Sequence, residues 1–154
     1  MKPIPQNRLK EILTPIGESR MVEANMEDRA NVAYSVEQVD HGYETRTAAA
    51  YVDDLDNPSS ALIVRTASSW LSPGHFCHIL LFWVKPEIRR TPKSAVLIED
   101  MRRTYNAFAH INECREIVAS SWVFLGSSEM DGIWSSDGFD LQEKVFVKSL
   151  TIET

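Results

Sequence analysis

The longest uninterrupted apolar run in the chain, Ile79–Val84, constrains the fold more than any other feature. It shows no alternation of apolar and polar residues, which is typical of a strand buried on both faces in the middle of a sheet. Pro86 cannot take part in a strand ladder, so the strand should end near it. A helical segment at 93–111 and a second mostly apolar segment at 116–125 follow. Buried strand, helix and buried strand in this order predict one parallel crossover.

The rest of the chain divides into helices first and short strands afterwards. Apolar residues recur at helical spacing in 6–16, and Gly17 offers a stop; 20–39 is a weaker helical stretch, either one helix or two short ones. Three short segments, each bounded by turn residues, predict antiparallel strands, and two segments close the chain. The strands lie within 45–54, 61–70 and 77–84; the closing segments are a turn or short helix at 126–138 and one or two strands at 139–150.

Size and charge limit the classes of protein to which the chain can belong. Its 154 residues, 44% of them hydrophobic, suit a single domain over 1–154, with a helical part at 1–42 and a sheet part at 43–154. A net charge of -6 makes a nucleic-acid-binding surface an unfavourable interpretation. Cys77 and Cys114 form no CxxC pair, and the apolar run is far shorter than the about 20 residues that cross a membrane. We therefore expect a cytoplasmic protein without membrane contact.

The turn after the apolar run is unusually cationic. It carries Arg89, Arg90 and Lys93, with the hydroxyls of Thr91 and Ser94, but no glycine. Such side chains can hold an anion through charge-assisted hydrogen bonds. The alternative is an ordinary solvated turn, in which Thr91 caps the helix and Pro92 takes its first position.

Several residues of this region resemble a known family. The GNAT superfamily of N-acyltransferases has a buried strand that ends in V-x-P-x-x-R-G-x-G-x-G, a helix with a leucine-rich face, and a G-F pair near the carboxyl terminus. The matching residues here are Val84, Pro86, Arg89, Leu97 and Gly138-Phe139, followed by Glu143 and "VFVKSL". The resemblance implies an α+β fold with a largely antiparallel central sheet, one parallel β-α-β crossover and flanking helices.

The resemblance also implies a site for acetyl-CoA or another acyl-CoA along this turn. In the family, backbone N–H groups at the helix start bind the pyrophosphate, and glycines let the backbone approach. Here Pro92 and Ser94 replace two of those glycines, and Arg90 stands where a third is common. A backbone N–H near Val84 or Lys85 would polarise the acyl carbonyl. The cofactor-binding residues expected are Val84, Lys85, Arg89, Arg90, Thr91, Lys93, Ser94 and Ala95.

The catalytic residues are less well marked. Many family members have a tyrosine in Y-x-x-x-G-F that reprotonates the leaving thiolate, and Trp134 takes that position here. An indole N–H can donate a hydrogen bond but cannot give up its proton near neutral pH. No first strand is evident before the opening helices, and the tail after Phe139 is short for a terminal hairpin. No catalytic residue is therefore assigned.

Other candidate sites have simpler interpretations. His75, Cys77 and His78 would point to both faces of a strand, so we expect no metal site there. A cysteine nucleophile needs a histidine that the sequence does not place. The acidic segment 53–56 precedes Asn-Pro and two serines, which favours a plain turn over a calcium site or a general base.

Two functions remain, beside an unrelated α+β domain with the same order of elements. The first is an acyl-CoA-dependent N-acyltransferase that transfers an acyl group, by expectation acetyl, to an amine of a small molecule or protein. The second is a catalytically degenerate GNAT-fold protein that serves assembly, such as a phage virion protein, with protein partners docking on the acidic segment 22–42. That segment is more commonly a solvated face.

Overall fold

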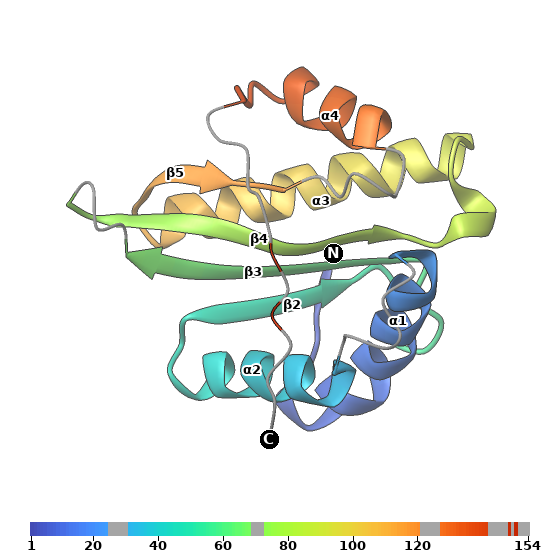
Figure 1. Cartoon of the computed structure of the whole chain (residues 1–154), viewed down its shortest axis with the longest axis horizontal. Helices are drawn as coiled ribbons and strands as arrows, with labels where there is room; N and C mark the ends of the chain where they lie inside the picture. The colour runs from blue at the N-terminus through green and yellow to red at the C-terminus, as the bar shows by residue number, and fades with distance from the viewer. Residues whose placement is uncertain (25–30, 69–72, 121–126, 142–147, 149, 151–154) are drawn as a thin grey trace.

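The computed structural model describes residues 1–24, 31–68, 73–120, 127–141, 148 and 150. In this part of the chain a five-stranded sheet has the order β1-β2-β3-β4-β5 (Figure 1). All neighbouring strands are antiparallel except β4 and β5, which are parallel. The strands are β1 (Lys2–Pro3), β2 (Ala48–Val52), β3 (Ser60–Ser68), β4 (His75–Val84) and β5 (Cys114–Val118). The sheet therefore confirms the predicted mixed α+β fold with its parallel crossover.

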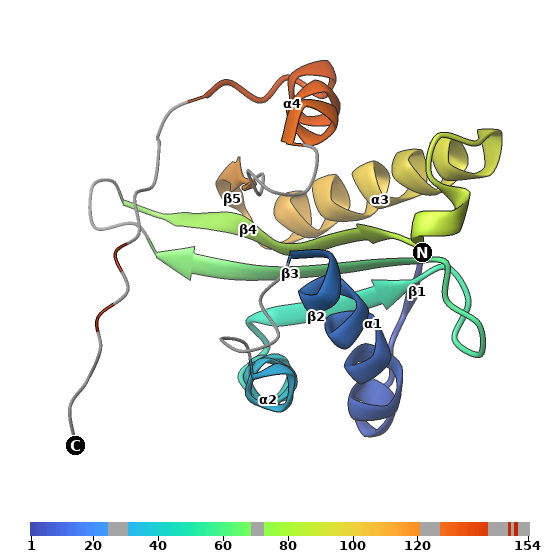
Figure 2. The same cartoon turned by 45° about the vertical axis from the view of Figure 1, so that its right-hand side comes forward.

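Helices cover both faces of the sheet (Figures 1 and 2). On one face the core is formed with α1 and α2, and on the other with α3 and α4. Short 3-10 turns, η1 and η2, precede α1 and α3. The bounds are η1 Gln6–Arg8, α1 Leu9–Ala24, α2 Val32–Glu44, η2 Pro86–Ile88, α3 Pro92–Ile111 and α4 Ser127–Ser136. None of the helices described is long and apolar enough to cross a membrane.

The amino-terminal part differs from the prediction in two ways. Helix α1 does not stop at Gly17 but continues to Ala24. Gly17 is there for packing, because a Cβ at this position would lie 2.7 Å from Cγ1 of Val32 at the start of α2. A first strand is also present, since Lys2–Pro3 pair with β2. Two residues are too few to show any alternation, so the sequence did not reveal it.

Strand β4 carries a bulge at Leu80. Ile63 of β3 lies opposite Leu81 and Val64 lies opposite Ile79, so Leu80 has no partner and is 44% exposed. The prediction that the whole run is buried on both faces was wrong at this residue. The extra residue also shifts the alternation of side chains along the strand. Ile79 and Phe82 are three positions apart, yet both belong to the core under α3.

The helix and strands at the carboxyl side agree with the sequence where they are described. Thr91 caps α3, Pro92 takes its first position, and the apolar face of the helix is buried. The predicted turn or short helix at 126–138 is α4. Of the strand expected at 116–125, β5 gives the first part and 121–126 lie outside the described residues. The strands expected at 139–150 also lie mostly outside them, at 142–147 and 149.

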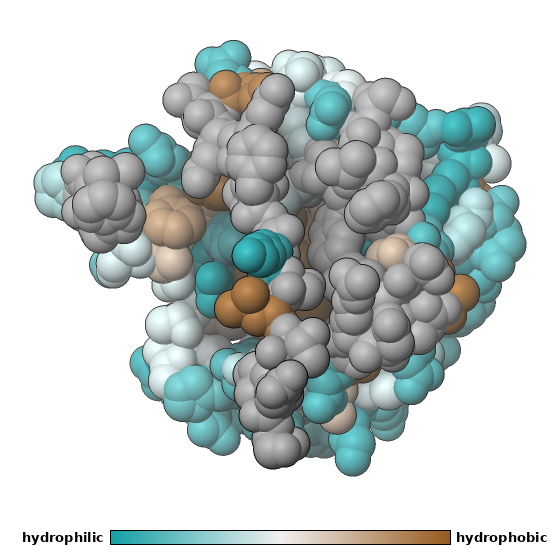
Figure 3. Space-filling view, in the orientation of Figure 1, coloured by the Kyte–Doolittle hydropathy of each residue, from teal (hydrophilic) through white to brown (hydrophobic). Residues whose placement is uncertain are grey.

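The face seen in Figure 3 is largely polar where residues are described. Hydrophilic side chains dominate it, and hydrophobic ones are scattered among them. The large hydrophobic side chains that are exposed belong to different elements, such as Val22 of α1, Tyr34 of α2 and Ile111 of α3. Single exposed apolar residues are normal on a soluble protein and do not by themselves mark a docking surface.

Candidate functional site

The carboxyl-terminal half of β4 has an edge without a strand partner in the described part of the chain. Its pairing with β5 ends at His78 and Val118, whereas pairing with β3 continues to Val84. The Lys85 N–H donates to the Ser59 carbonyl at 2.8 Å, which directs Lys85 toward β3. Because successive residues of a strand point their backbone groups to opposite sides, the N–H and C=O of Val84 face the other edge.

Arg89 closes the end of that edge. Its Nε donates to the Val84 carbonyl at 2.8 Å, and its two Nη atoms donate to the Glu23 carboxylate of α1 at 2.6 and 3.0 Å. Glu23 is mostly buried, and this bidentate ion pair links α1 to the end of β4. The guanidinium of Arg89 is therefore already engaged by groups of the chain itself.

Arg90 occupies the backbone conformation that glycine favours. Its φ is 62°, in the left-handed region, and this is the position where the family pattern commonly has glycine. Its side chain is 81% exposed and forms an ion pair with Glu129 of α4. Such an exposed pair is weak, so an anion can compete for this guanidinium.

The first turn of α3 uses its hydroxyls internally. Thr91 Oγ1 accepts a hydrogen bond from the Ser94 N–H at 3.4 Å, and Ser94 Oγ donates to the Thr91 carbonyl at 2.8 Å. The Ala95 N–H bonds the same carbonyl at 3.4 Å. Lys93 is exposed, and its ammonium lies 3.5 Å from the Ser59 hydroxyl. Arg90 and Lys93 are thus the cations of this turn that remain accessible to a ligand.

Comparison with known proteins identifies the architecture. No protein-family model and no curated protein sequence matches the chain. Among solved structures, a probable acetyltransferase matches with TM-score 0.70 at 15% identity, over 100% of this chain and 99% of that one. A predicted acetyltransferase with acetyl-CoA from Clostridium acetobutylicum has TM-score 0.71 at 7% identity, over 96% and 94%. The chain has the GNAT fold.

A third GNAT structure is similar over nearly the whole length of both chains. It is AAC(6')-Iy in complex with the bisubstrate analog CoA-S-monomethyl-acetylneamine, with TM-score 0.62 at 12% identity, over 98% of this chain and 97% of that one. At such identities the likeness concerns the fold. The matches decide against an unrelated domain with the same order of elements.

Trp134, which stands at the tyrosine position of the GNAT pattern, belongs to α4 and is buried in the core that α3 and α4 form with the sheet. Its ring meets Phe82 of β4 edge-on, with centroids 4.9 Å apart, and also contacts Tyr105 and Phe139. Its Nε1 is buried and has no hydrogen-bond partner among the described residues. Trp134 therefore packs against Phe82 and offers no titratable group.

Sequence reasoning missed one polar pair beside Trp134. The hydroxyl of Tyr105 donates to the Asp137 carboxylate. The pKa of Tyr105 is raised, mainly by burial and to a smaller extent by this hydrogen bond. The spacing of Tyr105 from Leu97 and Met101 is that of an apolar helix face, which gives no sign of a polar partner. Nothing in the sequence links it with Asp137. The raised pKa keeps the phenol protonated and bound to its carboxylate partner.

The remaining candidates behave as ordinary structural residues. Burial raises the pKa of the Cys77 thiol to about 12, which excludes a reactive thiolate at neutral pH. No cluster of three metal-ligating side chains occurs among the residues described. Asp53 and Asp54 accept hydrogen bonds from backbone N–H groups of their own turn, as expected for a plain turn.

Proposed function

We propose that the chain is an acyl-CoA-dependent N-acyltransferase that transfers an acyl group, acetyl in the simplest case, to an amine. The observation that carries this proposal is the edge of β4 beyond His78, which has no strand partner among the described residues. An extended ligand can lie along such an edge as an additional strand. Of the similar structures, the predicted acetyltransferase from Clostridium acetobutylicum is with acetyl-CoA, and AAC(6')-Iy is in complex with the bisubstrate analog CoA-S-monomethyl-acetylneamine.

Acyl-CoA would supply an acyl group activated as a thioester, together with an extended pantetheine arm. The chain supplies the N–H of Val84 on the edge facing away from β3, where it can bind a carbonyl oxygen. The Lys85 N–H is already used by Ser59, so we assign the backbone donor to Val84.

The phosphates of the ligand would be held at the turn before α3. Arg90 and Lys93 supply the positive charge, since both side chains are exposed. Arg89, Thr91 and Ser94 shape the turn through the contacts described above, and Ala95 continues the first turn of α3. The residues present fit an anion bound mainly by side chains, because Pro92 lacks an N–H and the Ser94 N–H is already bonded.

The amine acceptor is proposed only as a chemical class. The net charge of -6 favours the approach of a cationic amine in a general electrostatic sense. Neither Trp134 nor Tyr105 is assigned as an acid, because an indole does not titrate near neutral pH and the phenol is bound to Asp137. Two free cysteines agree with a cytoplasmic location for such an enzyme.

A degenerate GNAT-fold assembly protein, in a virion for example, is the second candidate. The observation that favours it is that Arg89 and Arg90 are both paired with carboxylates of the chain, Glu23 and Glu129. A turn that satisfies its own cations needs no phosphate. This function predicts that acyl-CoA does not bind and that the chain works through protein partners.

A calorimetric titration with acetyl-CoA separates the two candidates. The enzyme should bind it, and the double variant Arg90→Ala and Lys93→Ala should bind on the order of tenfold more weakly, because two charge-assisted contacts are lost. The double variant Lys10→Ala and Arg103→Ala removes the same charge elsewhere and should bind like the original chain. If millimolar acetyl-CoA gives neither heat nor a thermal shift, the acyltransferase proposal is overturned and the assembly protein is favoured.

A further inference from the structure

A pocket of about 410 Å³ lies on the side of the sheet covered by α1. Helix α1, the β2–β3 turn and the residues that follow β4 form its walls. A water molecule takes up about 30 Å³ in the liquid, so the pocket has room for a small organic molecule. The mechanism proposed above makes no use of this space.

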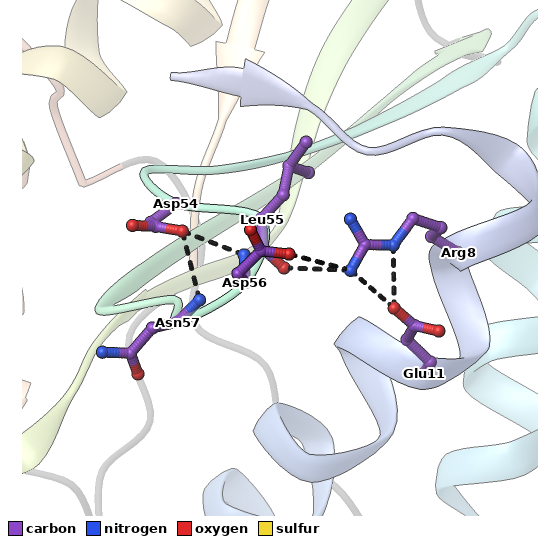
Figure 4. Close-up of polar contacts among 6 residues, drawn as sticks. All are labelled: Arg8, Glu11, Asp54, Leu55, Asp56 and Asn57. Carbon is purple, nitrogen blue, oxygen red and sulfur yellow. Dashed lines mark hydrogen bonds and ion pairs between the residues drawn. The ribbon is translucent and has the colours of Figure 1, made fainter.

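One rim of the pocket is fixed by a hydrogen-bond network (Figure 4). Arg8 donates from Nε to Glu11 at 2.7 Å, and from Nη2 to Asp56 at 3.4 Å and the Leu55 carbonyl at 3.5 Å. Asp54 holds the turn in place by accepting from the N–H groups of Asp56 and Asn57. The rim is therefore preformed, and the charge of Arg8 is matched by two carboxylates.

The residues after β4 add two charges of opposite sign to the lining. Lys85 and Glu87 flank Pro86, and neither forms an ion pair with any described residue. With the first rim, the lining thus contains two cationic and three anionic side chains. A simple anion would meet the three carboxylates, and a simple cation would meet Lys85 and Arg8. A molecule with one charge of each sign suits this lining best.

The inner wall is apolar. Ile12, Ile16 and Leu55 line it, together with the buried Trp83. An apolar part of a ligand can pack against this wall.

We propose that this pocket binds a small zwitterion of the amino-acid type. Its carboxylate is held by Lys85 and its ammonium group by Glu87. An apolar side chain of the ligand lies against Ile12 and Ile16. The proposal does not depend on the acyltransferase activity, because binding is measured without acyl-CoA.

The first test is a thermal-shift panel of the standard L-amino acids at about 10 mM, since a ligand that binds only the folded state raises its melting temperature. We expect stabilisation by amino acids with apolar side chains. Calorimetry then compares the best of them with its amide, which lacks the carboxylate, and its N-acetyl form, which lacks the ammonium group. Each derivative should bind roughly tenfold more weakly, because one charge-assisted contact is lost.

Two charge variants show whether the pocket is responsible. With Lys85→Met, the amino acid should no longer bind more tightly than its amide. With Glu87→Gln, it should no longer bind more tightly than its N-acetyl form. Lys10→Met and Glu18→Gln make the same changes of charge on exposed residues of α1 outside the pocket lining and should leave both preferences intact. Absence of stabilisation by every amino acid, or preferences that survive in the pocket variants, would overturn the proposal.

Discussion

Two turns meet at the same end of the sheet and are held in different ways. In the β2–β3 turn, Asp53 accepts from the N–H groups of Ser59 and Ser60, both at 2.8 Å, so the turn is fixed by its own residues. In the β4–α3 turn, Arg89 reaches a carboxylate 66 positions away and Arg90 one 39 positions away. The Lys85 N–H bonds the Ser59 carbonyl and joins the two turns.

The difference has a functional consequence. A turn held by hydrogen bonds between its own carboxylates and its own N–H groups keeps its shape when ligands are added, which suits the wall of a preformed pocket. In the second turn the pair of Arg89 with Glu23 is largely buried, whereas the pair of Arg90 with Glu129 is exposed and weakens as ionic strength rises. The first turn is therefore a scaffold, and the second can exchange the carboxylate of Glu129 for a phosphate at Arg90.

The largest expected effect is in the scaffold turn. Asp53→Ala should lower the free energy of unfolding by about 2–4 kcal/mol, because the N–H groups of Ser59 and Ser60 lose their acceptor in a buried position. Asp53→Asn retains an acceptor oxygen and should lose less than half as much. Urea unfolding of the three proteins measures this. If the alanine variant matches the original chain, the turn is not held by Asp53.

The second effect concerns the ion pair between α1 and the other turn. Arg89→Met should cost about 1–3 kcal/mol, because it leaves Glu23 and the Val84 carbonyl without their partner. A double-mutant cycle with Glu23→Gln isolates the coupling of the two side chains. Additive effects of the two substitutions would show that this pair does not fix the turn.

A smaller effect of opposite sign is expected at the neighbouring residue. Arg90→Gly should raise stability by about 0.5–1 kcal/mol, because glycine adopts the left-handed conformation freely and the exposed pair with Glu129 contributes little. Arg89→Gly removes a guanidinium from the adjacent position and should destabilise. Differential scanning calorimetry compares the two, and a lower melting temperature for Arg90→Gly would contradict the argument.

Helices and strands with a regular spacing of apolar residues could be predicted from the sequence. Leu97, Met101 and Tyr105 recur at helical spacing within the predicted helix at 93–111, and all three are buried in α3. The bulge at Leu80 could not be predicted, because inserting one residue into an entirely apolar run interrupts no alternation. Gly17 was misjudged as a stop because its reason for being glycine is a contact with Val32 on another helix.

For the candidate site, the sequence located the turn but not the partners of its side chains. Residues Val84 to Ala95 lie together because they are contiguous, and the glycine-like backbone of Arg90 agrees with the family pattern. The pairing of Arg89 with Glu23 depends on how α1 crosses the end of the sheet, and no local pattern encodes that. The pocket beside Trp83 escaped prediction for the same reason, since three separate segments form it.

The smallest expected effect depends on pH and returns to the scaffold turn. The N–H groups of Asp56 and Asn57 donate to Asp54, and these bonds lower the pKa of its carboxyl below the ordinary 3.8. A lowered pKa stabilises the folded chain above the ordinary value, and this contribution is lost as the pH falls through the lowered one. Asp54→Asn should therefore be slightly less stable than the original chain at about pH 7, with a difference that shrinks below about pH 4. Urea unfolding across this pH range, with Asp131→Asn on α4 as the charge-matched control, measures the change. A difference that stays constant down to about pH 3 would mean that the ionised carboxylate does not hold the turn.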